Sequence, residues 1–98
     1  MAQEMVLESL EDLRKSIDNI DNAIVAMLAE RFKVTNRVGQ LKASRNLPAK
    51  DPDREAMQHA RIQELSQVYG LDPGLASSIL NQVMAKVVLN HEQIAKTI

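Results

Sequence analysis

The sequence contains no cysteine and no tryptophan, and it has only one Phe, one Tyr, three Gly and three Pro among its 98 residues. The absence of cysteine excludes a disulfide scaffold, a thiolate metal site and a cysteine nucleophile. Few glycines and aromatic residues, together with a hydrophobic fraction of 45%, favour helices over strands. We therefore expect one small all-α domain that is held together by packing or by oligomerisation.

The chain also lacks a charge excess, because 12 Lys and Arg residues stand against 13 Asp and Glu residues. A net charge of -1 gives no electrostatic basis for non-specific binding to nucleic acid. No apolar run approaches the roughly 20 residues that a membrane span needs, and the first five residues have no basic segment typical of a signal peptide. We expect a cytoplasmic protein that binds neither nucleic acid nor a membrane.

Residues that could hold a metal or a phosphate group are sparse as well. The two histidines, His59 and His91, are 32 positions apart, which is not the spacing of a zinc-binding pair. The three scattered glycines form no phosphate-binding loop, and no segment resembles a nucleophile elbow. We therefore expect no metal and no cofactor.

Apolar residues recur at alternating steps of three and four in the first part of the chain, which predicts one long helix over about 6–44. The row consists of Val6, Leu10, Leu13, Ile17, Ile20, Ile24, Met27, Arg31, Val34, Val38 and Leu41. A helix over 7–44 would be about 57 Å long, whereas a compact chain of this size has a radius of gyration near 13 Å. We therefore predict that the row is buried in an intertwined, antiparallel homodimer. A kinked first helix in a monomeric bundle is the alternative, although Gly39 is too late in the helix to shorten it much.

Two further helices follow a loop over 45–51. Asp51 is a suitable N-cap and Pro52 a suitable first residue, so a second helix is predicted over about 52–69. Gly70 is placed for a left-handed C-terminal stop, and a second Asp-Pro pair predicts a third helix over about 73–97. The sequence therefore predicts a single domain over residues 1–98 with three helices, one long and two medium.

Three cations on the first helix are candidate ligand-binding residues. Arg31 occupies the apolar row, where an unpaired guanidinium is expensive to bury, so it either meets an anion or extends to water or to an acidic residue of a partner helix. Lys42 lies within about 20° of Arg31 around the helix and about 16 Å along it. Arg14 is about 42 Å from Lys42 along the same axis. Arg14 could join the other two only from an antiparallel partner, and taken alone it could equally be a solvated surface residue.

Charged or titratable residues also occupy the apolar faces of the later helices. Glu55, with Arg54 beside it, begins an otherwise apolar stripe, although acidic residues are common in first turns because they suit the helix dipole. His91 is in line with apolar neighbours on the third helix, where a lone histidine can also be a satisfied core residue. Together these residues indicate a cationic cavity between helices that suits a small dianion.

Four segments in this order resemble the all-helical (AroQ-type) chorismate mutases. They are LEDLRKSIDNID at 10–21, MLAER at 27–31, VGQLK at 38–42 and DPDRE at 51–55. The resemblance covers nearly the whole chain. It implies an intertwined helical dimer that converts chorismate to prephenate in phenylalanine and tyrosine biosynthesis, without a cofactor. Catalysis would come from holding the substrate in its reactive geometry and from stabilising charge on the breaking ether oxygen.

The resemblance also implies roles for individual residues. Arg14 of the partner subunit and Arg31 would bind the two carboxylates of the substrate, for which arginine is suited. Lys42 would contact a carboxylate and the ether oxygen. Glu55 would accept a hydrogen bond from the ring hydroxyl, helped by the backbone around Asp51. Arg54 would lie at the edge of the site.

Two positions on the third helix depart from the family pattern. Val87 stands where a hydroxyl residue commonly helps to bind the ring carboxylate, so one donor is lost. His91 stands where Gln or Glu commonly donates a hydrogen bond to the ether oxygen. Neutral imidazole can donate from one nitrogen and imidazolium from both. We expect His91 to complete the ether-oxygen site with Lys42, and we expect activity to depend on pH between about 5 and 8.

Two other functions remain open from the sequence. One is an isochorismate-pyruvate lyase, a relative on the same fold, although the DPDRE segment resembles the mutase form. The other is a weakly active helical module that binds or regulates another enzyme of the shikimate pathway, and Val87 and His91 keep that alternative open.

Overall fold

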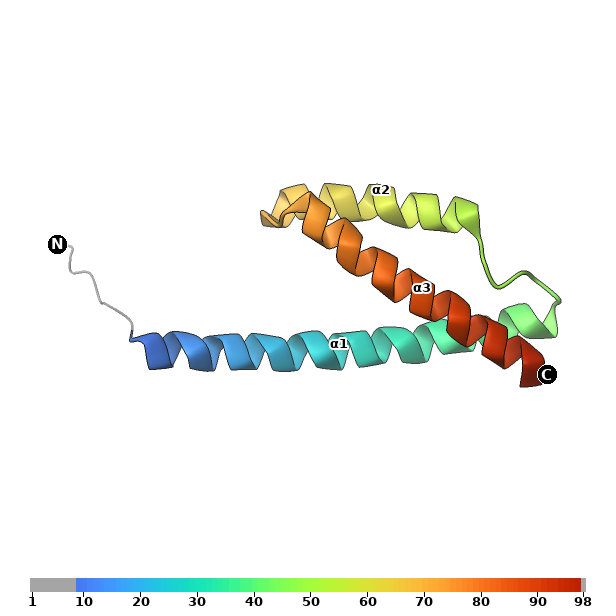
Figure 1. Ribbon diagram of the computed structural model, residues 1–98, viewed down its shortest axis with the longest axis horizontal. Helices are drawn as coiled ribbons and strands as arrows, with labels where there is room; N and C mark the ends of the chain where they lie inside the picture. The colour runs from blue at the N-terminus through green and yellow to red at the C-terminus, as the bar shows by residue number, and fades with distance from the viewer. Residues whose placement is uncertain (1–8, 98) are drawn as a thin grey trace. The chain divides into compact units, whose positions relative to one another are not determined.

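A computed structural model describes residues 9–97 and divides the chain into two compact units, Met1–Phe32 and Lys33–Ile98. Within the described residues all regular structure is helical, in the order α1, α2 and α3 (Figure 1), so the predicted all-α fold class is confirmed. The helices are α1 Leu10–Ser44, α2 Pro52–Tyr69 and α3 Pro73–Thr97. Helix α1 begins in the first unit and ends in the second. No helix in this part of the chain combines the length and apolarity that a membrane crossing requires.

The first unit consists, over its described residues, of the early part of α1. Ser9 precedes the helix, and its Oγ accepts a hydrogen bond from the backbone N–H of Asp12 at 3.0 Å, which is the geometry of an N-cap. The acidic Glu11 and Asp12 lie in the first turn, where the helix dipole favours them. The described helix therefore begins at Leu10, and the segment 6–8 of the predicted helix lies outside the described residues.

Helices α2 and α3 begin and end where their local signals indicate. The Asp51 carboxylate accepts from the backbone N–H of Arg54 at 3.1 Å, and Pro52 occupies the first helical position, so the predicted N-cap is confirmed. Gly70 has φ 70° and donates its N–H to the Ser66 carbonyl, so the predicted left-handed stop is confirmed as well. At the start of α3 the carbonyl of Asp72 accepts from the backbone N–H of Ala76 at 3.0 Å.

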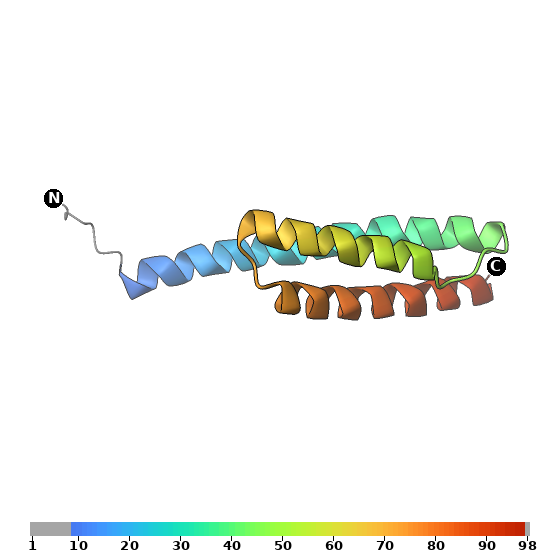
Figure 2. The ribbon, with the colours of Figure 1, turned by 90° about the horizontal axis from the view of Figure 1, so that it is seen from above.

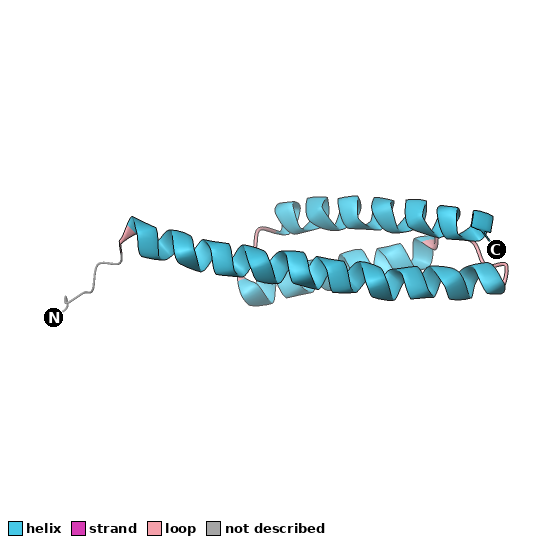
Figure 3. Cartoon of the chain, turned by 90° about the horizontal axis from the view of Figure 1, so that it is seen from below, coloured by secondary structure: helices cyan, strands magenta, loops and turns pink. Residues whose placement is uncertain are grey.

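The core of the second unit lies along α3. Helices α2 and α3 run side by side in opposite directions, joined by the short turn after Tyr69 (Figure 2). The most buried apolar residues are Ala76, Leu80 and Met84, each at 7 to 8% exposure. Ser66 on α2 is buried and donates its hydroxyl to the Ile62 carbonyl, which removes the cost of burying a free hydroxyl. The secondary structure around this core is helices joined by short loops (Figure 3).

The part of α1 that belongs to the second unit has two different faces. Gly39 is buried, and Thr35 and Lys42 on the same side are half-buried. Val34 and Val38, on another side, are 46% and 41% exposed. The apolar row of the first unit is exposed too, and its members at 43 to 68% exposure are Leu10, Leu13, Ile17, Ile20, Ile24 and Met27. The row that the sequence predicts to be a packing seam therefore faces outward from a single copy of the chain.

Candidate functional site

The residues predicted to form the site are divided between the two units. Arg14 and Arg31 lie in the first unit. The second unit holds Lys42, Asp51, Arg54, Glu55, Val87 and His91. Each unit is therefore described by itself.

Arg31 is the one predicted residue of the first unit that is shielded from solvent. Its side chain is half-buried, and its Nη1 atom is buried without a hydrogen-bond partner among residues 9–97. A guanidinium nitrogen that has lost water and gained no acceptor is unfavourable, and an anionic ligand would satisfy it. Arg14 is exposed, so in a single chain it is a solvated surface residue.

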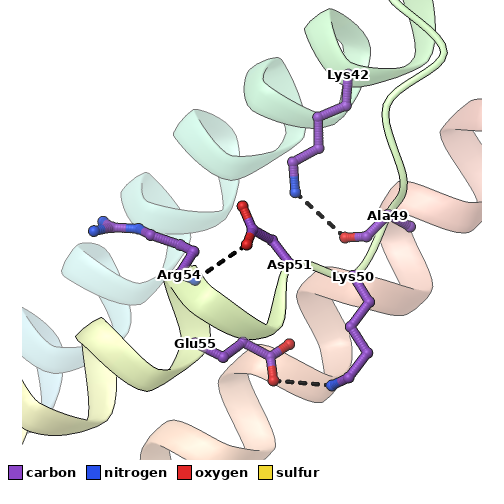
Figure 4. Close-up of polar contacts among 6 residues, drawn as sticks. All are labelled: Lys42, Ala49, Lys50, Asp51, Arg54 and Glu55. Atoms are coloured by element: carbon purple, nitrogen blue, oxygen red, sulfur yellow. Dashed lines mark hydrogen bonds and ion pairs between the residues drawn. The ribbon is translucent and has the colours of Figure 1, made fainter.

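Lys42 is positioned by the loop between α1 and α2. Its Nζ donates to the carbonyl oxygen of Ala49 at 3.3 Å (Figure 4). Its own carbonyl accepts from the backbone N–H of Leu47 at 2.8 Å. Asn46 turns the loop with a positive φ of 56°, a conformation that asparagine tolerates better than most residues. The ammonium group of this half-buried lysine is therefore held beside the start of α2 by one long hydrogen bond, and two of its three protons have no hydrogen-bond acceptor among the described residues.

Glu55 forms an ion pair with Lys50, and its predicted contact with a substrate hydroxyl stays a prediction. Its Oε1 lies 2.9 Å from Nζ of Lys50, and Figure 4 shows the carboxylate directed to Lys50 while Lys42 reaches the loop from α1. Lys50 is 62% exposed, so this ion pair is well solvated and contributes little to stability. Asp51 is occupied as the cap of α2, and the Arg54 side chain is exposed.

Glu55 also lines a cleft of about 490 Å³ between α2 and α3. The other lining residues are Lys50, His59, Asn81, Met84, Ala85, Val88, Leu89 and Glu92. Glu55 is the one predicted site residue among them. His59 is half-buried at this cleft.

His91 is the most deeply buried of the predicted residues, at 4% exposure. Its Nε2 lies 2.7 Å from the backbone carbonyl oxygen of Thr35, while Nδ1 is buried with no hydrogen-bond partner in the described chain. Gly39 makes this approach feasible, because a Cβ atom there would lie 2.6 Å from His91 Cδ2. Val87, one turn earlier on α3, is half-buried.

The structure therefore brings some of the predicted residues together and leaves others apart. Lys42 and Asp51 lie at the two ends of one loop, and Val87 and His91 occupy adjacent turns of α3. The contribution of Gly39 was missed by sequence reasoning, although a glycine inside a helix that faces a histidine is a signal of close backbone approach. Among the described residues, no group of three or more His, Asp or Glu could hold a metal ion.

Comparison with known proteins places the chain in a family. The family model described as chorismate mutase type II matches residues 13–92. A chorismate mutase of Methanocaldococcus jannaschii is 31% identical over 94 residues, which cover 90% of this chain and 95% of that protein. The bifunctional chorismate mutase/prephenate dehydratase of Aquifex aeolicus is 43% identical over 65 residues, covering 65% of this chain and 18% of that protein. The T-protein of Enterobacter agglomerans is 36% identical over 80 residues, covering 82% and 21% respectively.

The chain thus spans nearly all of the archaeal relative but about a fifth of the two longer proteins. The matched segment begins before Arg14 and ends after His91, so it includes all eight predicted site residues. On this match over most of its length, the chain belongs to the chorismate mutase type II family.

Proposed function

We propose that the protein converts chorismate to prephenate by an intramolecular rearrangement, in a site shared between two copies of the chain. The reaction breaks the C–O bond of the enol ether and forms a C–C bond within the same molecule. It therefore needs no nucleophile and no external oxidant or base. The protein has to hold the substrate's two carboxylates in the compact reactive geometry and stabilise the negative charge that develops on the ether oxygen.

The observation that carries this proposal is the buried Nη1 of Arg31 without a hydrogen-bond partner in the described residues. A cationic donor that is shielded from water calls for an anionic acceptor, and a substrate carboxylate supplies one with bidentate geometry. Lys42, whose Nζ makes one 3.3 Å hydrogen bond, retains protons for a second carboxylate and for the ether oxygen. These two cations provide the charge that a dianionic substrate requires.

Glu55 and Asp51 would act at the opposite end of the substrate. The Lys50–Glu55 ion pair is exposed on the lysine side, so Glu55 can exchange this partner for the substrate hydroxyl at little cost. The Asp51 side chain stays on the backbone of Arg54 and keeps the start of α2 in place. Val87 presents an apolar side chain rather than a hydroxyl donor. Binding of the ring carboxylate would therefore depend on Arg31, Lys42 and Arg54.

We propose that a second copy of the chain packs against the exposed apolar row of α1. The six members of this row between Leu10 and Met27 are 43 to 68% exposed, and Val34, Val38 and Leu41 continue the row at 41 to 49%. A contiguous apolar stripe of this extent is typical of an oligomer interface. In an antiparallel pair the exposed Arg14 would reach the partner's site. The family match crosses the boundary between the two units, so we propose that residues 1–98 act as one mutase domain.

The experiment measures the decrease in chorismate absorbance in the presence of the purified protein alone. The product is then identified as prephenate by its conversion to phenylpyruvate in acid. Isochorismate is assayed in parallel, because release of salicylate and pyruvate would indicate the lyase instead. Arg31→Ala should lower kcat/KM by about a hundredfold or more, since it removes a charged donor from the transition state. Arg37→Ala is the matched control, because Arg37 is an exposed arginine on the same helix and should leave the rate unchanged.

The proposed dimer interface and the candidate partner enzyme are tested in separate experiments. Ile20→Asp should convert a dimer to monomers in analytical ultracentrifugation and abolish turnover, whereas Asn19→Asp, at the neighbouring position outside the apolar row, should do neither. Two relatives named above are longer than this chain, and one carries prephenate dehydratase in its name. We therefore include a prephenate-consuming enzyme of the shikimate pathway as a candidate partner. A folded dimer that turns over chorismate only after such an enzyme is added would support the regulatory module.

A further inference from the structure

The two oxygen atoms of the Glu55 carboxylate have different surroundings. Oε1 lies 2.9 Å from Nζ of Lys50. No hydrogen bond from the described residues reaches Oε2. An ionised carboxylate can accept several hydrogen bonds at once, and the Glu55 side chain is 22% exposed. Oε2 is therefore open to one further donor while Oε1 keeps its lysine.

The loop backbone around Lys50 is held on both sides. The carbonyl of Ala49, immediately before it, accepts from Nζ of Lys42 at 3.3 Å. Asp51, immediately after it, is the N-cap of α2. Figure 4 shows the Lys50 side chain turned to Glu55 from this position. The anchored backbone keeps the ammonium group within reach of Glu55, whichever carboxylate oxygen a ligand uses.

Lys50 also determines the balance of charge in the cleft between α2 and α3. It is the one Lys or Arg among the residues that line this cleft, whereas Glu55 and Glu92 both contribute carboxylates. The remaining titratable residue of the lining is His59, which is mostly neutral above pH 7 in its ordinary state. Without Lys50 the cleft would carry two uncompensated negative charges, which favour a bound cation.

The substituent that Glu55 would accept from the substrate ring is a hydroxyl, which is neutral. A hydroxyl donates one hydrogen bond and adds no charge, so it can bind the carboxylate next to Lys50. An amino group at the same ring position would be an ammonium near pH 7, as primary amines are. It would then share one carboxylate with the ammonium group of Lys50. The repulsion between these like charges affects the amino compound alone.

We propose that Lys50 is a specificity-determining residue of the mutase site, which selects a substrate ring that carries a hydroxyl over the same ring with an amino group. This inference rests on the proposed function, in which Glu55 accepts from the ring hydroxyl. Lys50 does not contact the reacting atoms. Because its side chain is 62% exposed, solvent screens its charge and the selectivity that it adds is moderate.

The test compares kcat/KM for chorismate with kcat/KM for the analogue in which an amino group replaces the ring hydroxyl, at about pH 7.5. Lys50→Met should shift the ratio toward the amino compound by about two- to fivefold, as expected for a partly screened charge. Lys50→Glu doubles the change in charge and should shift the ratio further. Lys50→Arg retains the charge and should keep the wild-type ratio. Lys86→Met, at an exposed lysine of α3 outside the cleft lining, is the matched control and should also keep it.

Ionic strength provides a readout that a purely structural role of Lys50 would not change. As sodium chloride is raised to about 1 M, the screening length falls to about 3 Å. The wild-type ratio should then approach that of Lys50→Met, whose own ratio should respond less. If no variant converts the amino compound, its inhibition constant against chorismate turnover gives the same comparison.

The possible failures are distinguishable. An equal loss of kcat/KM for both compounds in Lys50→Met would show that Lys50 only holds Glu55 in place. That result, or a wild-type ratio that salt does not change, would overturn the inference and leave the mutase function intact. Absence of chorismate turnover by the wild type would overturn the proposed function itself, and this inference with it.

Discussion

Replacing Gly39 by alanine tests the packing of α3 on the second part of α1. The added Cβ would lie 2.6 Å from His91 Cδ2, a separation that packed side chains essentially never show, and 3.1 Å from both His91 Nε2 and Ile94 Cδ1. The nearest atoms belong to a buried ring rather than to the end of a flexible chain, so the strain cannot be relieved by a small rotation. The imidazole has to move away from α1 and give up its 2.7 Å hydrogen bond to Thr35.

Three contributions determine how much Gly39→Ala changes the free energy of unfolding. Overpacking of a buried site costs about 1 to 3 kcal/mol. Loss of one hydrogen bond adds about 0.5 to 1.5 kcal/mol. Alanine is a better helix former than glycine by about 1 kcal/mol, which offsets part of the loss. The free energy of unfolding should therefore fall by about 2 kcal/mol, with about 0.5 to 3.5 kcal/mol as the range spanned by these terms.

Urea unfolding followed by circular dichroism measures this change, at one fixed protomer concentration because oligomerisation shifts apparent stability. Gly74→Ala is the matched control, since its Cβ would meet Asp72 side-chain oxygens at no less than 3.6 Å and its φ is not in the left-handed region. That variant should be neutral or slightly stabilised. In a His91→Ala background, Gly39→Ala should lose its penalty, because the ring it collides with is gone.

The reasoning would be refuted by a Gly39→Ala protein as stable as the wild type with the hydrogen bond between His91 and Thr35 still formed. A penalty of equal size in the His91→Ala background would refute it too, because the cost would then come from something other than the ring.

Two further predictions concern the ends of α2. Asp51→Ala should lower the free energy of unfolding by about 1 kcal/mol, because the backbone N–H of Arg54 loses its cap, whereas Asp51→Asn should retain most of the stability in the same urea titration. Gly70→Ala should cost about 1 to 2 kcal/mol with no steric clash, because residue 70 has φ 70° and no atom lies within 4 Å of an added Cβ; a thermal melt that matches the wild type would contradict this.

The parts of the fold that the sequence predicts well depend on local chemistry. Asp51 and Pro52 have the residue types preferred at a helix N-cap and first position, and Gly70 stops a helix because glycine adopts positive φ freely. For α1, the apolar row predicts a start near residue 6, and residues 6–8 lie outside the described residues. The described helix begins at Leu10, where the backbone N–H of Asp12 donates to Oγ of Ser9.

The site was less predictable because its geometry depends on contacts between distant residues. His91 and Thr35 are 56 positions apart, and no periodicity indicates which ring nitrogen meets a backbone carbonyl. Glu55 could be placed on the right helix face, but its pairing with Lys50 depends on the path of the loop. Arg31 was singled out by its position in an apolar row, and its Nη1 is buried without a hydrogen-bond partner in the described residues. Its role in binding an anion stays a prediction.

The central claim, that two chains share each site, is tested most directly by mixing two inactive variants. Arg14→Ala and Lys42→Ala homodimers should each have little mutase activity. After unfolding and refolding together in equal amounts, half of the dimers should be mixed, with one site carrying both defects and the other carrying neither. We predict recovery of about a quarter of the wild-type activity, as random pairing with two-fold symmetry requires. Recovery of no activity beyond that of the parent variants, with mixed dimers present, would contradict the claim.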